Sequence, residues 1–353
     1  MSLPLPFLPR LMAMTPTQWP HRDPQPIVNT VVATESAALT IPSFPKLLKI
    51  GSEQVAQGMP CLVADPERRR FYFDTSDPAL LETELTVFYE HYLANDVDYF
   101  AISPEASPGL HRTLEALKGR SGEGRFISCS VGGPITFTMQ TTDENNKPIF
   151  YNEALRDAAV KTLEMKARWL YRAIKQAVPG AIVGCRFAEP LLSLYGTPFA
   201  SLPREEILSC LNACFTAAPG PTTVHCCANI DWPILFETAT DIIHFDAFEY
   251  ADKLALYPYE LQAYLDRGGL LAWGIVPANN DKLLGETVDS LVARFEQGLD
   301  CMEAHGLKRK QLLETAFLQP SCSLGTMTEE LAERAFHYTL EMSNLLRASY
   351  FGG

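Results

Sequence analysis

A strand, a helix and a second strand follow one another between residues 181 and 225. The stretch opens on the apolar run Ala181-Ile-Val-Gly-Cys-Arg-Phe187 and closes on Thr222-Thr-Val-His225. Between these runs, residues 204–217 carry apolar side chains at the i, i+3, i+4 and i+7 positions of an amphipathic helix. Because parallel strands need a long crossover connection, this order predicts a parallel sheet.

The same alternation continues along most of the chain. Strands are also expected at 98–103, 125–130, 241–246, 270–276 and 313–319, and helices at 152–177, 258–267, 286–306 and 328–348. Thr328 is expected to cap the last of these helices, since acidic residues follow it in the first turn. At least seven such units in one chain favour a closed α/β barrel, the (β/α)8 or TIM barrel, over an open sheet.

The N-terminal part, residues 1–95, is less regular. Pro-rich runs flank one helical pattern from Ile27 to Ala38, and the cluster Arg68-Arg69-Arg70 lies in a hairpin-like segment. We interpret this part as the first strand and helix plus an insertion, so that residues 1–353 form a single TIM-barrel domain with an N-terminal extension. We interpret the arginine cluster as a solvated turn rather than a phosphate clamp.

Charge and cysteine content limit the class of protein. The chain has 353 residues and a formal net charge of −13, which disfavours nucleic acid and anionic membrane surfaces as partners. Its longest apolar runs fall short of the roughly 20 residues of a membrane span. Nine cysteines, an odd number, without a signal-peptide pattern indicate reduced thiols in a cytoplasmic protein. A small molecule or another protein is the expected partner.

Metal-binding side chains follow three of the expected strands. His225-Cys-Cys227 follows one strand, Glu249 follows the next, and Cys322 follows the last. Because side chains alternate along a strand, His225 and Cys227 are expected to share a face that Cys226 does not. Barrel active sites form at these carboxyl ends, and an imidazole, two thiolates and a carboxylate form a ligand set that Zn²⁺ selects.

Each member of this set has a structural alternative. A His-Cys-Cys run is, taken alone, more often a packed strand end than a metal site. His244 and Asp246 compete with Glu249, since they occupy the alternate face of the same strand. The spacing does not choose between them.

The order and spacing of these residues resemble a known family. His225-x-Cys227, Glu249 at 22 residues further on, and Pro320-Ser-Cys322 are similar to the zinc ligands of the cobalamin-independent methionine synthase family. Val131-Gly-Gly-Pro134-Ile-Thr resembles its Thr-Gly-Pro-Val-Thr turn, and Glu189-Pro190 resembles its Asp-Glu-Pro segment. The resemblance runs from about residue 95 to the end and is strongest to the short, single-barrel form related to uroporphyrinogen decarboxylase.

The resemblance implies an enzyme, a zinc-dependent methyltransferase acting on a thiol. Its acceptor would be homocysteine, giving methionine, and its donor a methyl-folate or a methyl-corrinoid, free or carried by a corrinoid protein. The family's duplicated N-terminal barrel has no counterpart in this chain, which favours the corrinoid. The implied zinc ligands are His225, Cys227, Glu249 and Cys322, whose three anionic members would leave a formal charge of about −1 on the site.

The implied substrate-binding residues are less well defined: they are Glu189, Gln18, His21 and Asn279. Ala188 stands where the family has the aspartate that grips the amino group of homocysteine. The family's serine segment matches either Gln18-Trp-Pro-His21 or Ile41-Pro-Ser43-Phe-Pro45, and context favours the former. Asn279 stands near the position of a catalytic histidine.

The residues leave three other functions open. One is a methylcobalamin-dependent methyltransferase for another thiol, of the coenzyme M type. A second is a decarboxylase of the uroporphyrinogen type, which needs no metal. The third is a non-catalytic binding protein with a structural zinc, although such sites are usually closed and rich in sulfur.

Overall fold

Eight parallel strands form one curled sheet in the computed structural model, which describes residues 4–48, 53–65, 67–68 and 70–352. A parallel bridge between Met14 and Ala38 joins the ends of the two outermost strands, β1 and β2, so that the sheet closes on itself. The fold is therefore the (β/α)8 barrel that the sequence predicts. The barrel strands are β1 (Met12–Ala13), β2 (Leu39–Thr40), β5 (Phe126–Gly132), β6 (Ile182–Ala188), β7 (Thr222–Cys226), β8 (Ile242–Phe245), β9 (Leu270–Val276) and β10 (Ala316–Pro320).

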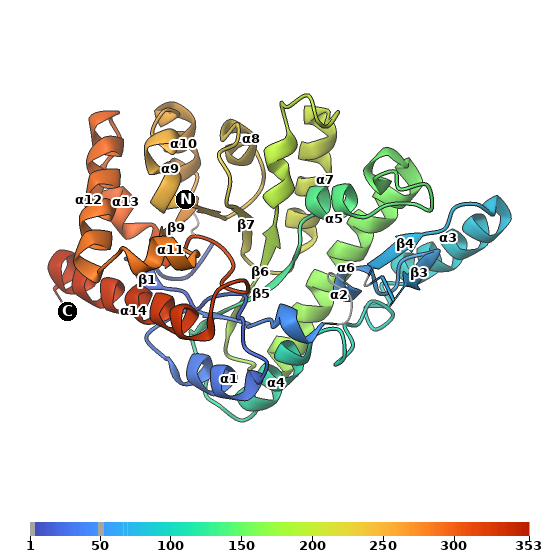
Figure 1. The fold of residues 1–353 in the computed structure, drawn as a ribbon, viewed down its shortest axis with the longest axis horizontal. Helices are drawn as coiled ribbons and strands as arrows, with labels where there is room; N and C mark the ends of the chain where they lie inside the picture. The colour runs from blue at the N-terminus through green and yellow to red at the C-terminus, as the bar shows by residue number, and fades with distance from the viewer. Residues whose placement is uncertain (1–3, 49–52, 66, 69, 353) are drawn as a thin grey trace.

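Helices surround the strands, as Figure 1 shows. They bury an apolar face against the sheet, and most begin at a proline or a side-chain cap. The longer ones are α1 (Pro24–Ala33), α4 (Pro108–Leu117), α6 (Glu153–Ala177), α7 (Arg204–Ala217), α9 (Ala247–Leu254), α10 (Pro258–Asp266), α12 (Val288–Ala304) and α14 (Glu329–Phe351). Shorter ones are α5 (Pro134–Gln140), α8 (Pro233–Phe236), α11 (Asn280–Leu284), α13 (Arg309–Glu314), and the 3-10 turns η2 (Ile149–Tyr151) and η3 (Pro190–Leu194).

The N-terminal part contributes more to the barrel than the sequence predicts. It supplies two barrel strands, β1 and β2, and the helix between them, α1. The insertion follows β2 and contains η1 (Pro45–Leu47), α2 (Glu53–Ala56), the antiparallel hairpin of β3 (Leu62–Asp65) and β4 (Arg70–Phe73), and α3 (Pro78–Leu93). The hairpin and α3 lie at one side of the molecule, away from the sheet (Figure 1). The hairpin at the arginine cluster is as expected, although Arg69 lies outside the described residues.

The strand expected at 98–103 is wrong. These residues form turns after α3, and they carry no strand pairing. Phe100 is nevertheless fully buried, with its ring edge-on to Phe88 at a centroid distance of 5.6 Å. The apolar run that suggested a strand therefore fills the core beneath α3 instead of joining the sheet.

Most other predicted elements match within one or two residues. Thr328 caps α14, since its Oγ1 accepts a hydrogen bond from Leu331 N at 3.3 Å. The expected strand at 313–319 begins later, at Ala316, because α13 occupies the preceding residues up to Glu314. The helix predicted over 27–38 ends at Ala33, which leaves room for β2. Among the described helices, none is long and apolar enough to cross a membrane.

The strand register aligns one layer of residues near the carboxyl ends of the strands. Gly132 pairs with Ala188, Ala188 with His225, and His225 with His244. Paired residues of parallel strands point to the same side of the sheet, and here that side is the barrel interior. Two of the four residues have little or no side chain, so space opens beside the two histidines.

Candidate metal centre

Three side chains converge at the carboxyl end of the barrel. His225 lies in β7, Cys227 follows the end of β7, and Cys322 follows β10. One donor atom of each lies within 4.8 Å of the other two. The distance from Cys322 Sγ to His225 Nε2 is 3.7 Å, close to the about 3.6 Å expected between a sulfur and a nitrogen that bind one tetrahedral zinc. Cys226 lies apart from this cluster and is fully buried in the core.

The protonation of these groups also suits a cation. Burial, and next the charge of Arg186, lower the pKa of His225, so its imidazole is neutral. A hydrogen bond from Cys227 is the main cause that holds the pKa of the Cys322 thiol well below its usual range. The same hydrogen bond, with burial, raises the pKa of Cys227. The two thiols therefore share a proton, and a divalent cation between them would replace it.

The donor set fits a metal such as zinc. One imidazole nitrogen and two thiol sulfurs are ligands that Zn²⁺ prefers over hard cations such as Mg²⁺. The cluster counts three protein donors among the described residues. Catalytic zinc sites commonly have three protein ligands and a fourth position for a substrate or water, whereas structural sites have four.

Glu249 does not join this cluster. It lies in the first turn of α9, and its Oε1 accepts a hydrogen bond from Lys282 Nζ at 2.6 Å. Its two rivals are engaged as well: Asp246 caps α9 by accepting from Glu249 N at 3.0 Å, and both ring nitrogens of His244 have other partners. The fourth ligand thus stays a prediction, and Glu249 would have to leave Lys282 to supply it.

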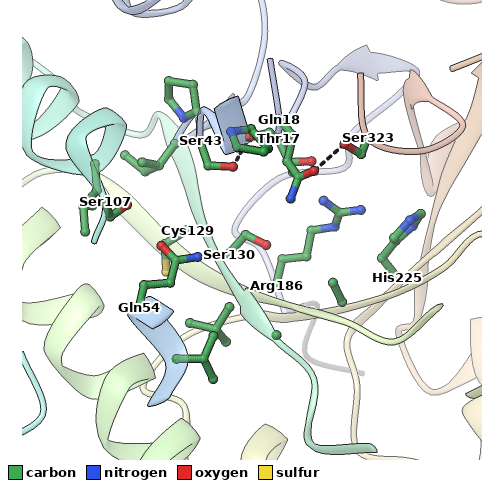
Figure 2. Close-up of a pocket in the computed structure, with 18 of the residues that line it drawn as sticks. Thr17, Gln18, Ser43, Gln54, Ser107, Cys129, Ser130, Arg186, His225 and Ser323 are labelled. Carbon is green, nitrogen blue, oxygen red and sulfur yellow. Dashed lines mark hydrogen bonds between the residues drawn. The ribbon is translucent and has the colours of Figure 1, made fainter. Parts of the chain in front are cut away.

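A cavity of about 370 Å³ opens beside the cluster and is lined by all three of its residues. This volume is in the range of small-molecule sites. Figure 2 shows that the lining also comes from the N-terminal part of the chain, through Gln18 and Ser43. The segments of these two residues are bridged side by side. Both segments therefore line the cavity, and which of them matches the serine segment of the family stays a prediction.

The other predicted substrate residues lie elsewhere. His21 is buried and its Nε2 lies 2.9 Å from Glu333 Oε1. Asn279 caps α11 through a hydrogen bond that its Oδ1 accepts from Lys282 N at 3.1 Å. Neither lines the cavity described here. Their contact with a substrate stays a prediction, while Gln18 stands at the cavity wall.

Glu189 joins the two segments that the resemblance singled out. Its carboxylate is fully buried and accepts hydrogen bonds from Ile135 N at 2.9 Å and Thr136 N at 2.7 Å. Burial is the main cause that raises the pKa of Glu189 to about 7. Gly133 is needed beside it, since a Cβ there would lie 2.2 Å from Glu189 Cδ. Glu189 thus fixes the cavity wall at Ala188, and its direct contact with a substrate stays a prediction.

Arg186 is a cavity residue that the sequence pattern did not predict. It is 4% exposed, lines the cavity, and lies on the inward face of β6 two residues before Ala188. One of its NH2 groups lies 3.1 Å from His244 Nδ1, and the His244 ring stacks on His225 at 4.2 Å. Burial lowers the pKa of Arg186 to about 10, which leaves it charged. An arginine within an otherwise apolar strand was the available signal.

Comparison with known proteins yields only fold likeness. No family model matches the chain, and no curated protein matches its sequence. One similar structure is the "Putative Vitamin-B12 Independent Methionine Synthase" from Listeria monocytogenes, with 16% identity, a TM-score of 0.46, and coverage of 68% of this chain and 70% of that one. Another is the GH113 beta-mannanase AaManA from Alicyclobacillus acidocaldarius, with 12% identity, a TM-score of 0.41, and coverage of 98% and 97%. Such values carry no argument about function, which rests on the site itself.

Proposed function

We propose that this protein is a zinc-dependent enzyme that transfers a methyl group to a thiol. The observation that carries the proposal is the His225, Cys227 and Cys322 cluster in the wall of a cavity at the carboxyl end of a barrel. That end is where barrel enzymes have their active sites. The resemblance of the ligand spacing to the methionine synthase family supports the same reaction class.

The residues of the chain would divide the work as follows. Cys227 and Cys322 supply two negative charges, and His225 supplies a neutral nitrogen, so that the three donors balance the charge of Zn²⁺. His244, stacked on His225, restricts the orientation of the imidazole. Zinc, when bound, lowers the pKa of a substrate thiol so that it reacts as a thiolate.

The cavity supports alkyl transfer better than hydrolysis. A hydrolytic zinc site needs a general base beside the attacking water. Among the described residues that line the cavity there is no aspartate or glutamate, and its one histidine belongs to the metal cluster. Methyl transfer to a thiolate needs no such base, since the nucleophile is already deprotonated.

Two alternatives make different demands on the same residues. A decarboxylase of the uroporphyrinogen type gives the cluster no role, although all three of its residues line the cavity. A structural zinc protein would be expected to enclose its metal with four ligands, whereas three described donors face a cavity. Both alternatives predict no methylated thiol.

The test is a methyl-transfer assay of zinc-loaded protein, with methylcobalamin or methyl-folate as donor and a panel of thiols as acceptors. We expect a methylated thiol from the wild type and from Cys226→Ala, a matched cysteine outside the cluster. We expect loss of both zinc and product in Cys227→Ala and Cys322→Ala. No product from either donor class, with zinc bound, would contradict the proposal.

A further inference from the structure

The charges around the cavity are strongly one-sided. Among the described residues that line it, Arg186 is the only side chain with a permanent charge, and no lysine or carboxylate accompanies it. The protein as a whole has a formal net charge of −13. A cation therefore faces the cavity in a chain where acidic groups predominate.

This arginine lacks the partner that a buried charge normally has. No carboxylate of the described residues lies within 4.0 Å of it, and its Nε is buried without a hydrogen-bond partner. Arg125 also has an unpaired Nε, but its two NH2 groups donate to the backbone oxygens of Val31, Val32 and Thr34, whereas those of Arg186 have only His244 Nδ1 as a partner among the described residues. Burying an unpaired charge is costly, so a fold retains one where something else supplies the counter-charge.

The orientation of the guanidinium is fixed from one side. His244 Nε2 lies 3.1 Å from Pro320 O, which can only accept, so Nε2 carries the proton and Nδ1 accepts from Arg186. Figure 2 shows the Arg186 guanidinium between the side chains of Gln18 and His225. The group is therefore held in place by a neutral histidine, which adds no negative charge of its own.

Gln18 offers a second donor beside it. Ser323 Oγ accepts from Gly325 N at 3.1 Å and donates to Gln18 Oε1. This sets the orientation of the amide, so that the NH2 group of Gln18 is on the cavity side (Figure 2). A guanidinium and an amide NH2 together suit the oxygens of a carboxylate or sulfonate.

The metal cluster cannot serve as the counter-charge once zinc is bound. Before a thiol binds, two thiolates neutralise Zn²⁺ and His225 is neutral, so Arg186 meets the incoming substrate with one unbalanced positive charge. We propose that Arg186 and Gln18 bind the anionic group of the substrate, and that the thiol acceptor carries a carboxylate or sulfonate and no ammonium group. This proposal rests on the proposed function for the thiol. The exclusion of an ammonium group follows from Ala188 and from the lack of any described carboxylate in the lining.

The test compares three thiols of similar length that differ in charge. Calorimetric titration of zinc-loaded protein measures the Kd of 3-mercaptopropionate, its amide, and cysteamine, which bears an ammonium group. We expect the carboxylate to bind at least tenfold more tightly than the amide, and cysteamine to bind most weakly. The carboxylate preference should vanish in Arg186→Gln and persist in part in Arg186→Lys. It should remain unchanged in Arg172→Gln, which removes a surface arginine paired with Asp98.

Butyrate and butyramide, which lack the thiol, separate this proposal from the proposed function. If butyrate binds more tightly than butyramide only when Arg186 is present, but the protein methylates no thiol, the anion site is supported and the proposed methyltransferase function is contradicted. If the protein methylates thiols equally well whatever their charge, the methyltransferase function is supported and the anion site is contradicted. An amide that binds as tightly as its carboxylate in the wild type, or a preference that survives in Arg186→Gln, would overturn the proposal.

Discussion

The buried carboxylate of Glu189 should make the stability of the fold depend on pH in an unusual direction. Two causes oppose each other here: burial raises the pKa, and the backbone hydrogen bonds from Ile135 and Thr136 lower it. Burial prevails and brings the pKa to about 7, from an ordinary value of 4.5. In the folded state Glu189 therefore binds a proton that the unfolded chain has already lost between these two values.

The sign and size of the effect follow by linkage. Because the folded pKa is raised, the contribution of Glu189 to stability is fully present below pH 4.5 and is lost as the pH rises to about 7. At 1.36 kcal/mol per pH unit, the loss is about 3 kcal/mol. No discount for solvent screening applies, since the side chain is fully buried.

Urea unfolding of the wild type and of Glu189→Gln, at intervals from pH 4.5 to 8, isolates this term. The glutamine does not titrate, and its NH2 group cannot accept from a backbone N–H, so the variant starts less stable at pH 4.5. The free energy of unfolding of the wild type, relative to that of the variant, should then fall by about 3 kcal/mol between pH 4.5 and 7. If the two free energies of unfolding change in parallel with pH, the raised pKa is refuted. If the wild type instead gains stability relative to the variant as the pH rises, the hydrogen bonds prevail over burial.

Three further predictions concern other buried or paired groups. Glu249→Gln should retain one zinc per chain, because Glu249 is paired with Lys282 outside the cluster; loss of zinc by metal analysis would establish it as the fourth ligand. Gly133→Ala should lower the free energy of unfolding, measured by urea unfolding, by about 1–3 kcal/mol through overpacking. Gly285→Ala is the control and should leave it unchanged, because a Cβ there meets one atom at 3.5 Å. Burial lowers the pKa of Lys166 to about 7, so the wild type should gain stability relative to Lys166→Met as the pH rises from about 7 to 10.5. A pH-independent difference would contradict that.

The sequence predicts the barrel well because its main signal is local. Strands such as Leu270–Val276 and helices such as Arg204–Ala217 are defined by their own apolar spacing. The two-residue strands β1 and β2 are too short for a period to be seen, and their pairing is decided by distant parts of the chain. The strand predicted at 98–103 is wrong because a short apolar run is buried in the core whether or not it is a strand. Only its backbone hydrogen bonds distinguish the two cases, and the sequence does not show them.

The candidate site divides in the same way. Strand alternation correctly separates Cys226 from Cys227, and fold topology brings Cys322 beside them. The position of Glu249 could not be predicted in the same way, because it lies in the first turn of the helix that follows its strand. From there its side chain can point to the metal cluster or to Lys282, and it pairs with Lys282. The role of Arg186 could not be predicted from the sequence. It depends on the absence of a carboxylate among the described residues of the cavity wall, which are far apart in the sequence.

X-ray absorption at the zinc edge, with and without 3-mercaptopropionate, tests the central claim most directly. The account predicts a shell of one nitrogen and two sulfurs from His225, Cys227 and Cys322, completed by an oxygen or nitrogen donor. Addition of the thiol should replace that donor with a third sulfur at about 2.3 Å. A shell that already holds four protein donors and stays unchanged when the thiol is added would contradict the account.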